Sequence, residues 1–218
     1  MVTEVANQVQ AVNSTNHDLG VKRDSGKHPA CAYFPLVPGT KTPMIPAWQV
    51  VVPGQYQAVG NYGINLTARD LVLDFDPRNY PPGRDVLSEM VKTFKIPGTR
   101  IVATPRGGCH IYLRKPPQLK FKKLQAAYPG VDFLSIDHYV VGPGSTTVAS
   151  DKSAAGTYEI IADADIADAP AELLEALEQS GEAVTRGSNY TVSSLDNFKM
   201  WCSVYPAAAR GSRDSSAI

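Results

Sequence analysis

The stretch 71–76 reads LVLDFD and is followed at once by Pro77. Its residues alternate with period two, which predicts a strand with Leu71, Leu73 and Phe75 on one face. Val72 shares the other face with Asp74 and Asp76, whose side chains at i and i+2 would lie about 7 Å apart. Two neighbouring carboxylates cost free energy unless a cation compensates, so the pattern favours a divalent metal site. A solvated turn entry has the same pattern, and the motif alone leaves both interpretations open.

The composition excludes several classes of protein. The 218 residues hold 21 basic and 21 acidic side chains, so any nucleic-acid binding must come from a local patch. The three cysteines, Cys31, Cys109 and Cys202, form no C-x-x-C pair, which argues against a zinc knuckle or a disulfide framework. No apolar run approaches the roughly 20 residues of a membrane span, and no signal peptide is evident. We therefore expect a soluble cytoplasmic protein that does not bind membranes.

The patterns divide the chain into a polar N-terminal arm (1–28), a central domain (29–165) and a C-terminal helical segment with a linker (166–218). Residues 161–170 read as a small acidic connector. Residues 61–65 precede the predicted strand 71–76 and could pair with it as a hairpin or a nearby antiparallel ladder. Helices are predicted over 85–94, from Pro170 to Gly181, and over 191–205, where Leu195, Phe198 and Cys202 share one helical face. Further strands are predicted at 101–103, 109–113, 131–134, 139–141 and around Tyr158, with an edge strand through Tyr33 and Phe34 that prolines interrupt.

A turn between two predicted strands is the first candidate for binding phosphate. It consists of Thr104, Pro105, Arg106, Gly107 and Gly108, and paired glycines let backbone N–H groups approach an anion. His110 follows on the next strand and can donate a hydrogen bond to a phosphate oxygen. A hairpin with two glycines is also common without any ligand, so both interpretations stand.

Basic residues and a third carboxylate complete the set of candidates. The densest basic run contains Lys120, Lys122 and Lys123, and Lys41 lies in the loop PGTKTP, so these four lysines are candidates for contacting DNA. Asp132 points outward from the strand predicted over 131–134. Three carboxylates that hold two divalent cations beside a phosphate-binding turn are typical of phosphoryl or nucleotidyl transfer.

The ordered motifs LVLDFD, TPRGGCHIYL, GVDF, YVVGPGS and Gly-x-Tyr (156–158) resemble the N-terminal domain of bifunctional DNA primase/polymerases. That family belongs to the archaeo-eukaryotic primase superfamily and occurs in plasmid and phage replication proteins. The resemblance covers about residues 31–160. It implies that Asp74, Asp76 and Asp132 are catalytic metal ligands for Mg²⁺ or Mn²⁺ and that His110 contacts the incoming triphosphate.

The resemblance also implies an α+β fold, in which a mixed or largely antiparallel catalytic sheet related to the RNA-recognition motif has flanking helices, lies beside an N-terminal α/β unit and precedes C-terminal helices. The implied activity is template-directed synthesis of primers or longer DNA from nucleoside triphosphates, in a bacterial or archaeal host. One metal would lower the pKa of the attacking 3′-hydroxyl, and the other would stabilise the leaving pyrophosphate. The substrates would be a single-stranded template or a primer-template.

The sequence departs from the family in a few places. Arg106 stands where a small residue is common, while Leu134 and the pair Asp137-His138 replace an Arg and a Gly-Gly that often follow the third Asp. Arg106 could therefore take over the contact of the missing arginine. There is no G-x-x-x-x-G-K-[ST] motif, so a helicase partner would lie beyond Ile218 or on another protein.

Two other functions use the same residues. A metal-dependent nuclease would employ the carboxylates to activate water, although the Gly-Gly turn and His110 favour a triphosphate. A non-catalytic nucleic-acid-binding module of a replication protein would tolerate the loss of Asp74 or Asp76. A rolling-circle initiator is disfavoured, because His110-Ile111-Tyr112 lacks the second histidine of its metal motif.

Overall fold

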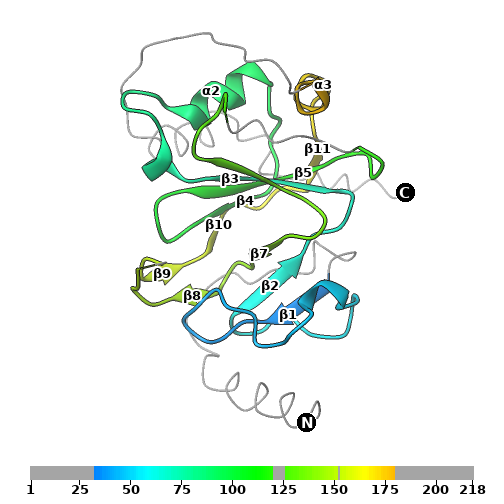
Figure 1. Cartoon of the computed structure of the whole chain (residues 1–218), viewed down its shortest axis with the longest axis vertical. Helices are drawn as coiled ribbons and strands as arrows, with labels where there is room; N and C mark the ends of the chain where they lie inside the picture. Colours follow the sequence, from blue (N-terminus) through cyan, green and yellow to red (C-terminus); the bar gives the residue numbers. More distant parts are fainter. Residues whose placement is uncertain (1–31, 120–125, 152, 180–218) are drawn as a thin grey trace, which may run out of the picture.

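The computed structural model describes residues 32–119, 126–151 and 153–179. Within them the chain forms a mixed α/β fold in which helices cover one face of a large sheet and a smaller sheet lies on the other side (Figure 1). The elements in chain order are β1 (Ala32–Pro35), η1 (Trp48–Val50), β2 (Tyr62–Asn65), β3 (Asp70–Phe75), η2 (Pro77–Asn79), α2 (Val86–Thr93), β4 (Ile101–Ala103), β5 (Cys109–Arg114), β6 (Val131–Leu134), β7 (Tyr139–Val141), β8 (Thr146–Thr147), β9 (Gly156–Thr157), β10 (Glu159–Ala162), β11 (Ala167–Asp168) and α3 (Ala171–Gln179).

The larger sheet has the strand order β10-β4-β5-β3-β6, and every pair along this path is antiparallel. Strand β4 is short and pairs only with the first half of β5. Strand β11 pairs in parallel with the last two residues of β5, which β4 does not reach. The stretch 161–170, expected to be a connector, therefore contains the end of β10 and a sheet strand.

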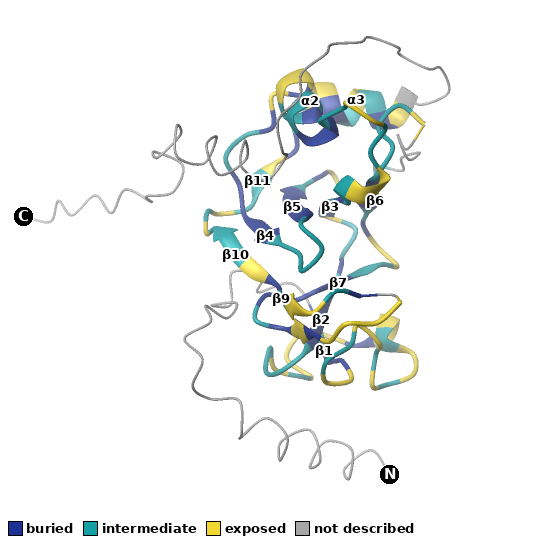
Figure 2. Cartoon of the chain, turned by 90° about the vertical axis from the view of Figure 1, so that its left-hand side faces the viewer, coloured by how far each residue is buried: buried dark blue, intermediate teal, exposed yellow. Residues whose placement is uncertain are grey.

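The two faces of β3 enter different hydrophobic cores, as the period-two alternation predicts. Leu71, Leu73 and Phe75 pack in the core that α2 and α3 cover, whereas Val72 belongs to the core shared with the smaller sheet. Figure 2 shows buried residues concentrated in the central strands between these layers. Burial on both sides makes β3 the central strand of the domain.

The helices predicted over 85–94 and from Pro170 are present in the described residues, whereas the predicted helix over 191–205 lies outside them. The side chain of Asp85 accepts a hydrogen bond from the Ser88 backbone N–H and so caps α2, which buries Val86 and Met90 completely. In α3, Leu173 and Leu177 are also fully buried in the helix-covered core. No helix in the described ranges is both long enough and apolar enough to cross a lipid bilayer.

The smaller sheet has the order β1-β2-β7, with β1 at its edge as the prolines predict. The predicted pairing of residues 61–65 with β3 is wrong, because β2 pairs with β1 and β7. Both edges of β3 are already hydrogen-bonded to β5 and β6. The described residues before β3 contain two strands and a 3-10 turn, so the expected N-terminal α/β unit has no α-helix in this part of the chain.

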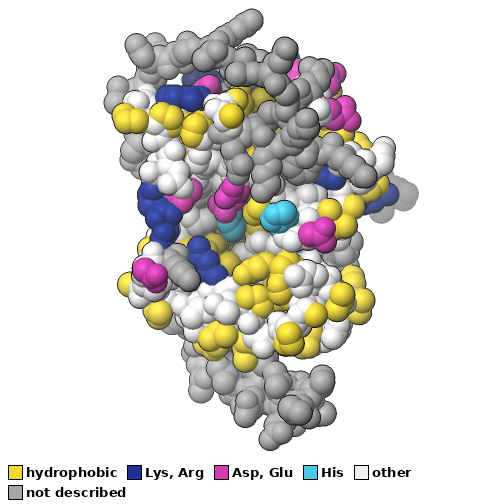
Figure 3. Space-filling model, in the orientation of Figure 1, with side chains coloured by type: hydrophobic (Ala, Val, Ile, Leu, Met, Phe, Trp, Pro, Cys, Tyr) yellow, Lys and Arg dark blue, Asp and Glu magenta, His cyan; other side chains and the backbone are white. Residues whose placement is uncertain are grey.

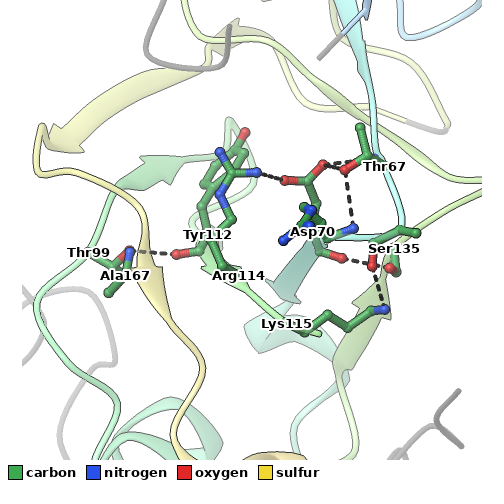
Figure 4. Close-up of polar contacts among 10 residues, drawn as sticks. Thr67, Asp70, Thr99, Tyr112, Arg114, Lys115, Ser135 and Ala167 are labelled. Carbon is green, nitrogen blue, oxygen red and sulfur yellow. Dashed lines mark hydrogen bonds and ion pairs between the residues drawn. The ribbon is translucent and has the colours of Figure 1, made fainter. Parts of the chain in front are cut away.

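Polar contacts fix the end of β3 that lies away from Asp74 (Figure 4). The Asp70 carboxylate accepts hydrogen bonds from Thr67 and forms an ion pair with Arg114 at 2.5 Å. Ser135 donates its hydroxyl to the Asp70 carbonyl, and Lys115 Nζ donates to the Ala68 carbonyl. These bonds join the start of β3 to β5 and to the end of β6, which secures the register of the three strands.

Candidate active site

The register of the central strands brings three predicted site residues together. Asp74 on β3 lies opposite His110 on β5 and, across its other edge, opposite Asp132 on β6. Directly opposed residues of antiparallel strands point to the same face. Like charges in such a pair destabilise a sheet unless a positive charge compensates, so the pairing of Asp74 with Asp132 favours a cation nearby.

Asp76 lies one residue beyond the end of β3 and begins the 3-10 turn η2. Its carboxylate forms a two-pronged ion pair with Arg78, in which Arg78 Nε donates to Oδ1 at 2.8 Å and Nη2 donates to Oδ2. Partial burial raises the pKa of Asp76, but the hydrogen bonds and positive charge of Arg78 outweigh burial, so the net pKa is lower than usual. Asp76 is therefore ionised and engaged by Arg78.

His110 is buried at the back of the site. Its Nε2 lies 3.6 Å from Asp74 Oδ1, and its Nδ1 has no hydrogen-bond partner among the described residues. Burial lowers the pKa of His110, and the negative charge of Asp74 only partly counteracts this. The imidazole is consequently neutral at pH 7, with one N–H to donate.

The predicted phosphate turn, residues 104–108, joins β4 to β5 and lies against the end of β3. Thr104 and Gly108 close it through a backbone hydrogen bond of 2.9 Å, and Gly107 adopts a positive φ of 79°. A Cβ atom on Gly108 would stand 1.9 Å from the Phe75 carbonyl oxygen, so a glycine is needed where the turn approaches β3. Arg106 extends from this turn and donates a hydrogen bond to the Asp151 carbonyl at 3.2 Å.

These elements surround a cavity of about 340 Å³. On the face shown in Figure 3, acidic, basic and histidine side chains gather across the middle of the molecule. The charged residues that line the cavity are Asp74, Asp76, Asp132, Lys41, Arg78 and Arg106. His110, Thr104 and Tyr158 line it as well, whereas Gly107 and Gly108 shape the turn behind it.

Lys41 reaches this cavity from the loop after β1. Desolvation at the cavity lowers the pKa of Lys41, and attraction to Asp74 opposes this effect. The Tyr139 hydroxyl donates a hydrogen bond to the Lys41 carbonyl at 2.8 Å and anchors the loop. Lys41 therefore lies in the same cavity as the carboxylates. The other predicted DNA-binding residues, Lys120, Lys122 and Lys123, lie outside the described residues.

The donor set suits a hard divalent cation, because carboxylate oxygens are the ligands that Mg²⁺ and Mn²⁺ prefer. Asp74 and Asp132 fit this role by their position and charge. Asp76 lines the same cavity but is turned toward Arg78. In the part of the chain that is described, no three His, Cys, Asp or Glu side chains are gathered closely enough to hold an ion.

Several residues of the cavity wall are not predicted by the motifs in the sequence: Arg78, Asn79, Thr147, Ser153 and Ala154. Arg78 had a local signal, since a cation two residues after a carboxylate in a turn that begins with proline can fold back onto it. Thr147 and Ser153 come from the segment between β7 and β9, which reaches the site only through tertiary folding.

The fold and the site together define a mixed α/β protein with a charged pocket at one end of an antiparallel sheet. The family of bifunctional DNA primase/polymerases, N-terminal domain, matches residues 23–172, more than half of the chain, and the chain belongs to this family. The resemblance inferred from the motifs is thereby confirmed. A comparison with curated proteins found no match. Membership indicates a nucleotidyltransferase-type enzyme with primase/polymerase-type activity in DNA replication.

Proposed function

We propose that this chain synthesises primers, extends DNA strands, or does both, from nucleoside triphosphates on a single-stranded template. The context would be phage or plasmid replication, with a helicase on a further domain or another protein. The observation that supports this proposal best is the row His110–Asp74–Asp132 across three adjacent strands, facing a cavity whose rim carries cations.

The chain's own groups divide into two sets. Lys41 and Arg106 project from loops and would bind the phosphates of the incoming nucleotide. Neutral His110 would donate its N–H to a phosphate oxygen without adding a charge at the back of the site. Asp74 and Asp132, joined by Asp76, would hold one or two Mg²⁺ or Mn²⁺ ions.

Bound divalent cations would supply charge neutralisation of the phosphates and activation of the attacking 3′-hydroxyl. The sheet contributes a fixed spacing between Asp74 and Asp132, because both lie on hydrogen-bonded strands. Rigid placement of the groups that bind the phosphates and the primer end is the main contribution that protein makes to phosphoryl and nucleotidyl transfer.

The test is synthesis on a single-stranded template with Mg²⁺ or Mn²⁺ and labelled nucleoside triphosphates, with and without a primer. Asp74→Asn and Asp132→Asn should each lower synthesis by about 10³-fold or more, since each removes a charge at the reacting centre. Asp137→Asn is the matched control, because Asp137 is an exposed carboxylate in the turn after β6 and asparagine tolerates its positive φ of 68°.

Products formed without a primer would identify a primase, and extension that needs a primer would identify a polymerase alone. A shortened template without synthesis would instead support the nuclease. Template binding that survives both substitutions, with no turnover by the parent chain, would support a non-catalytic module.

A further inference from the structure

The carboxylate of Asp76 is fully engaged by neighbours in its own turn. Oδ1 accepts from Arg78 Nε at 2.8 Å and from the Arg78 backbone N–H at 3.3 Å. Oδ2 accepts from Arg78 Nη2 and from Asn79 Nδ2 at 3.3 Å. Four donors occupy the lone pairs that a metal ion would need. In this conformation Asp76 cannot serve as a ligand beside Asp74 and Asp132.

Arg78 is placed so that its guanidinium can leave Asp76 and bind another anion in the cavity. Its side chain is about half exposed, at 50%, and it lines the same cavity as Lys41 and Arg106. Among the described residues, its guanidinium has no ion-pair partner other than Asp76. Rotation of the Arg78 side chain would break the two guanidinium bonds to Asp76. The two remaining bonds, from the Arg78 backbone N–H and from Asn79, are long at 3.3 Å and would break when the Asp76 side chain rotates.

We propose that Arg78 is a clamp that holds Asp76 away from the metal site in the nucleotide-free protein and moves to the triphosphate when the nucleotide binds. This inference rests on the proposed function. A triphosphate offers the guanidinium the same planar, two-pronged partner that the carboxylate offers, with more negative charge. The exchange would release Asp76 to join Asp74 and Asp132.

Arg78 is thus a positioning residue for Asp76 and a binding residue for the nucleotide. Because each ligand favours the state that the other needs, the nucleotide and the cation bind cooperatively, and linkage requires the effect to be reciprocal. The device would disfavour a fully assembled metal site in the absence of nucleotide.

The test measures binding without turnover. Mn²⁺ alone is titrated against the full chain, with free Mn²⁺ followed by electron paramagnetic resonance, and dATP is then titrated by calorimetry at saturating Mn²⁺ without DNA. Arg78→Gln should bind Mn²⁺ alone about tenfold more tightly, the scale of a lost charge-assisted contact, and should bind dATP several-fold more weakly.

Two further variants separate the clamp from simple charge. Arg106→Gln removes a cation from the same cavity that is not bonded to Asp76, so Mn²⁺ affinity should stay within about twofold of wild type while dATP binding weakens. Arg78→Lys keeps the charge but loses the two-pronged geometry, so it should tighten Mn²⁺ binding and retain most of the dATP affinity.

Equal Mn²⁺ affinities of Arg78→Gln and Arg106→Gln would overturn the clamp, as would unchanged dATP affinity in Arg78→Gln. Absence of Mn²⁺ binding by both the wild type and Arg78→Gln would overturn the clamp and the metal site together. The expected binding pattern in a chain that synthesises no DNA would support the clamp and refute the proposed function.

Discussion

Replacing Gly108 by alanine separates the two interpretations of the Gly-Gly turn. The added Cβ would stand 1.9 Å from the Phe75 carbonyl oxygen and 3.1 Å from its carbon, which no side-chain rotation can relieve because both atoms are backbone. Either the turn or the end of β3 must move. We expect the free energy of unfolding to fall by about 3 kcal/mol, near the upper range for overpacking. The corresponding fall in melting temperature is about 6–12 °C for a chain of this size.

The assay is urea denaturation of the nucleotide-free protein, followed by dATP binding well below the melting point. Gly83→Ala is the control for adding a Cβ to a glycine without a clash, because nothing lies within 4 Å of the added Cβ there; Gly83, unlike Gly108, has a positive φ, of 76°. It should cost only about 1 kcal/mol, from backbone strain. If Gly108→Ala were no less stable than Gly83→Ala but lost dATP binding, the packing argument would be refuted in favour of direct phosphate contact.

Two more predictions concern stability. Burial lowers the pKa of His110 in the folded chain. Near pH 6.5 the unfolded chain therefore binds a proton at His110 that the folded chain does not bind, so the free energy of unfolding should fall as the pH falls below about 6.5. In His110→Gln the free energy of unfolding, measured by urea denaturation, should fall less between pH 7 and pH 5 than in the wild type. The same pH dependence in both proteins would contradict the role of His110. Asp70→Asn leaves Arg114 without its carboxylate and should cost about 2 kcal/mol in the same assay, and a cost below that of an exposed ion pair would show that Asp70 does not secure the strand register.

Local periodicity was enough to predict the strands β3 to β7, the helices α2 and α3, and the faces of β3 and β6, but not the short strand β11. The alternation in 71–75 correctly separates the residues that pack under the helices from Val72, which enters the second core. The same rule places Asp132 outward between buried Val131 and Phe133. These predictions succeed because the direction of a side chain on a strand depends only on its position in the pleat.

The partner of each strand and the partner of each charged side chain could not be predicted in the same way. Whether β2 pairs with β3 or with β7 depends on which strand edges remain free after the whole sheet has formed. The alternation also places Asp76 with Asp74, but the strand ends at Phe75 and a 3-10 turn brings Arg78 onto the carboxylate. A pattern of residue types specifies the face that a carboxylate occupies, and it does not specify the partner that the carboxylate chooses.

The acidic and basic residues that line the cavity come from different elements of the fold. Its acidic residues come from β3, β6 and the residue after β3, whereas its cations come from the loop after β1, η2 and the β4–β5 turn. Equal numbers of each sign leave no strong net field at the site, but the two signs are supplied by different elements. A divalent cation bound at the sheet and phosphates bound at the loops would match this separation. Loops can adjust while hydrogen-bonded strands cannot. Under the proposed function, the sheet would therefore set the geometry of the metal site, and Lys41, Arg78 and Arg106 on the loops would adapt to the nucleotide.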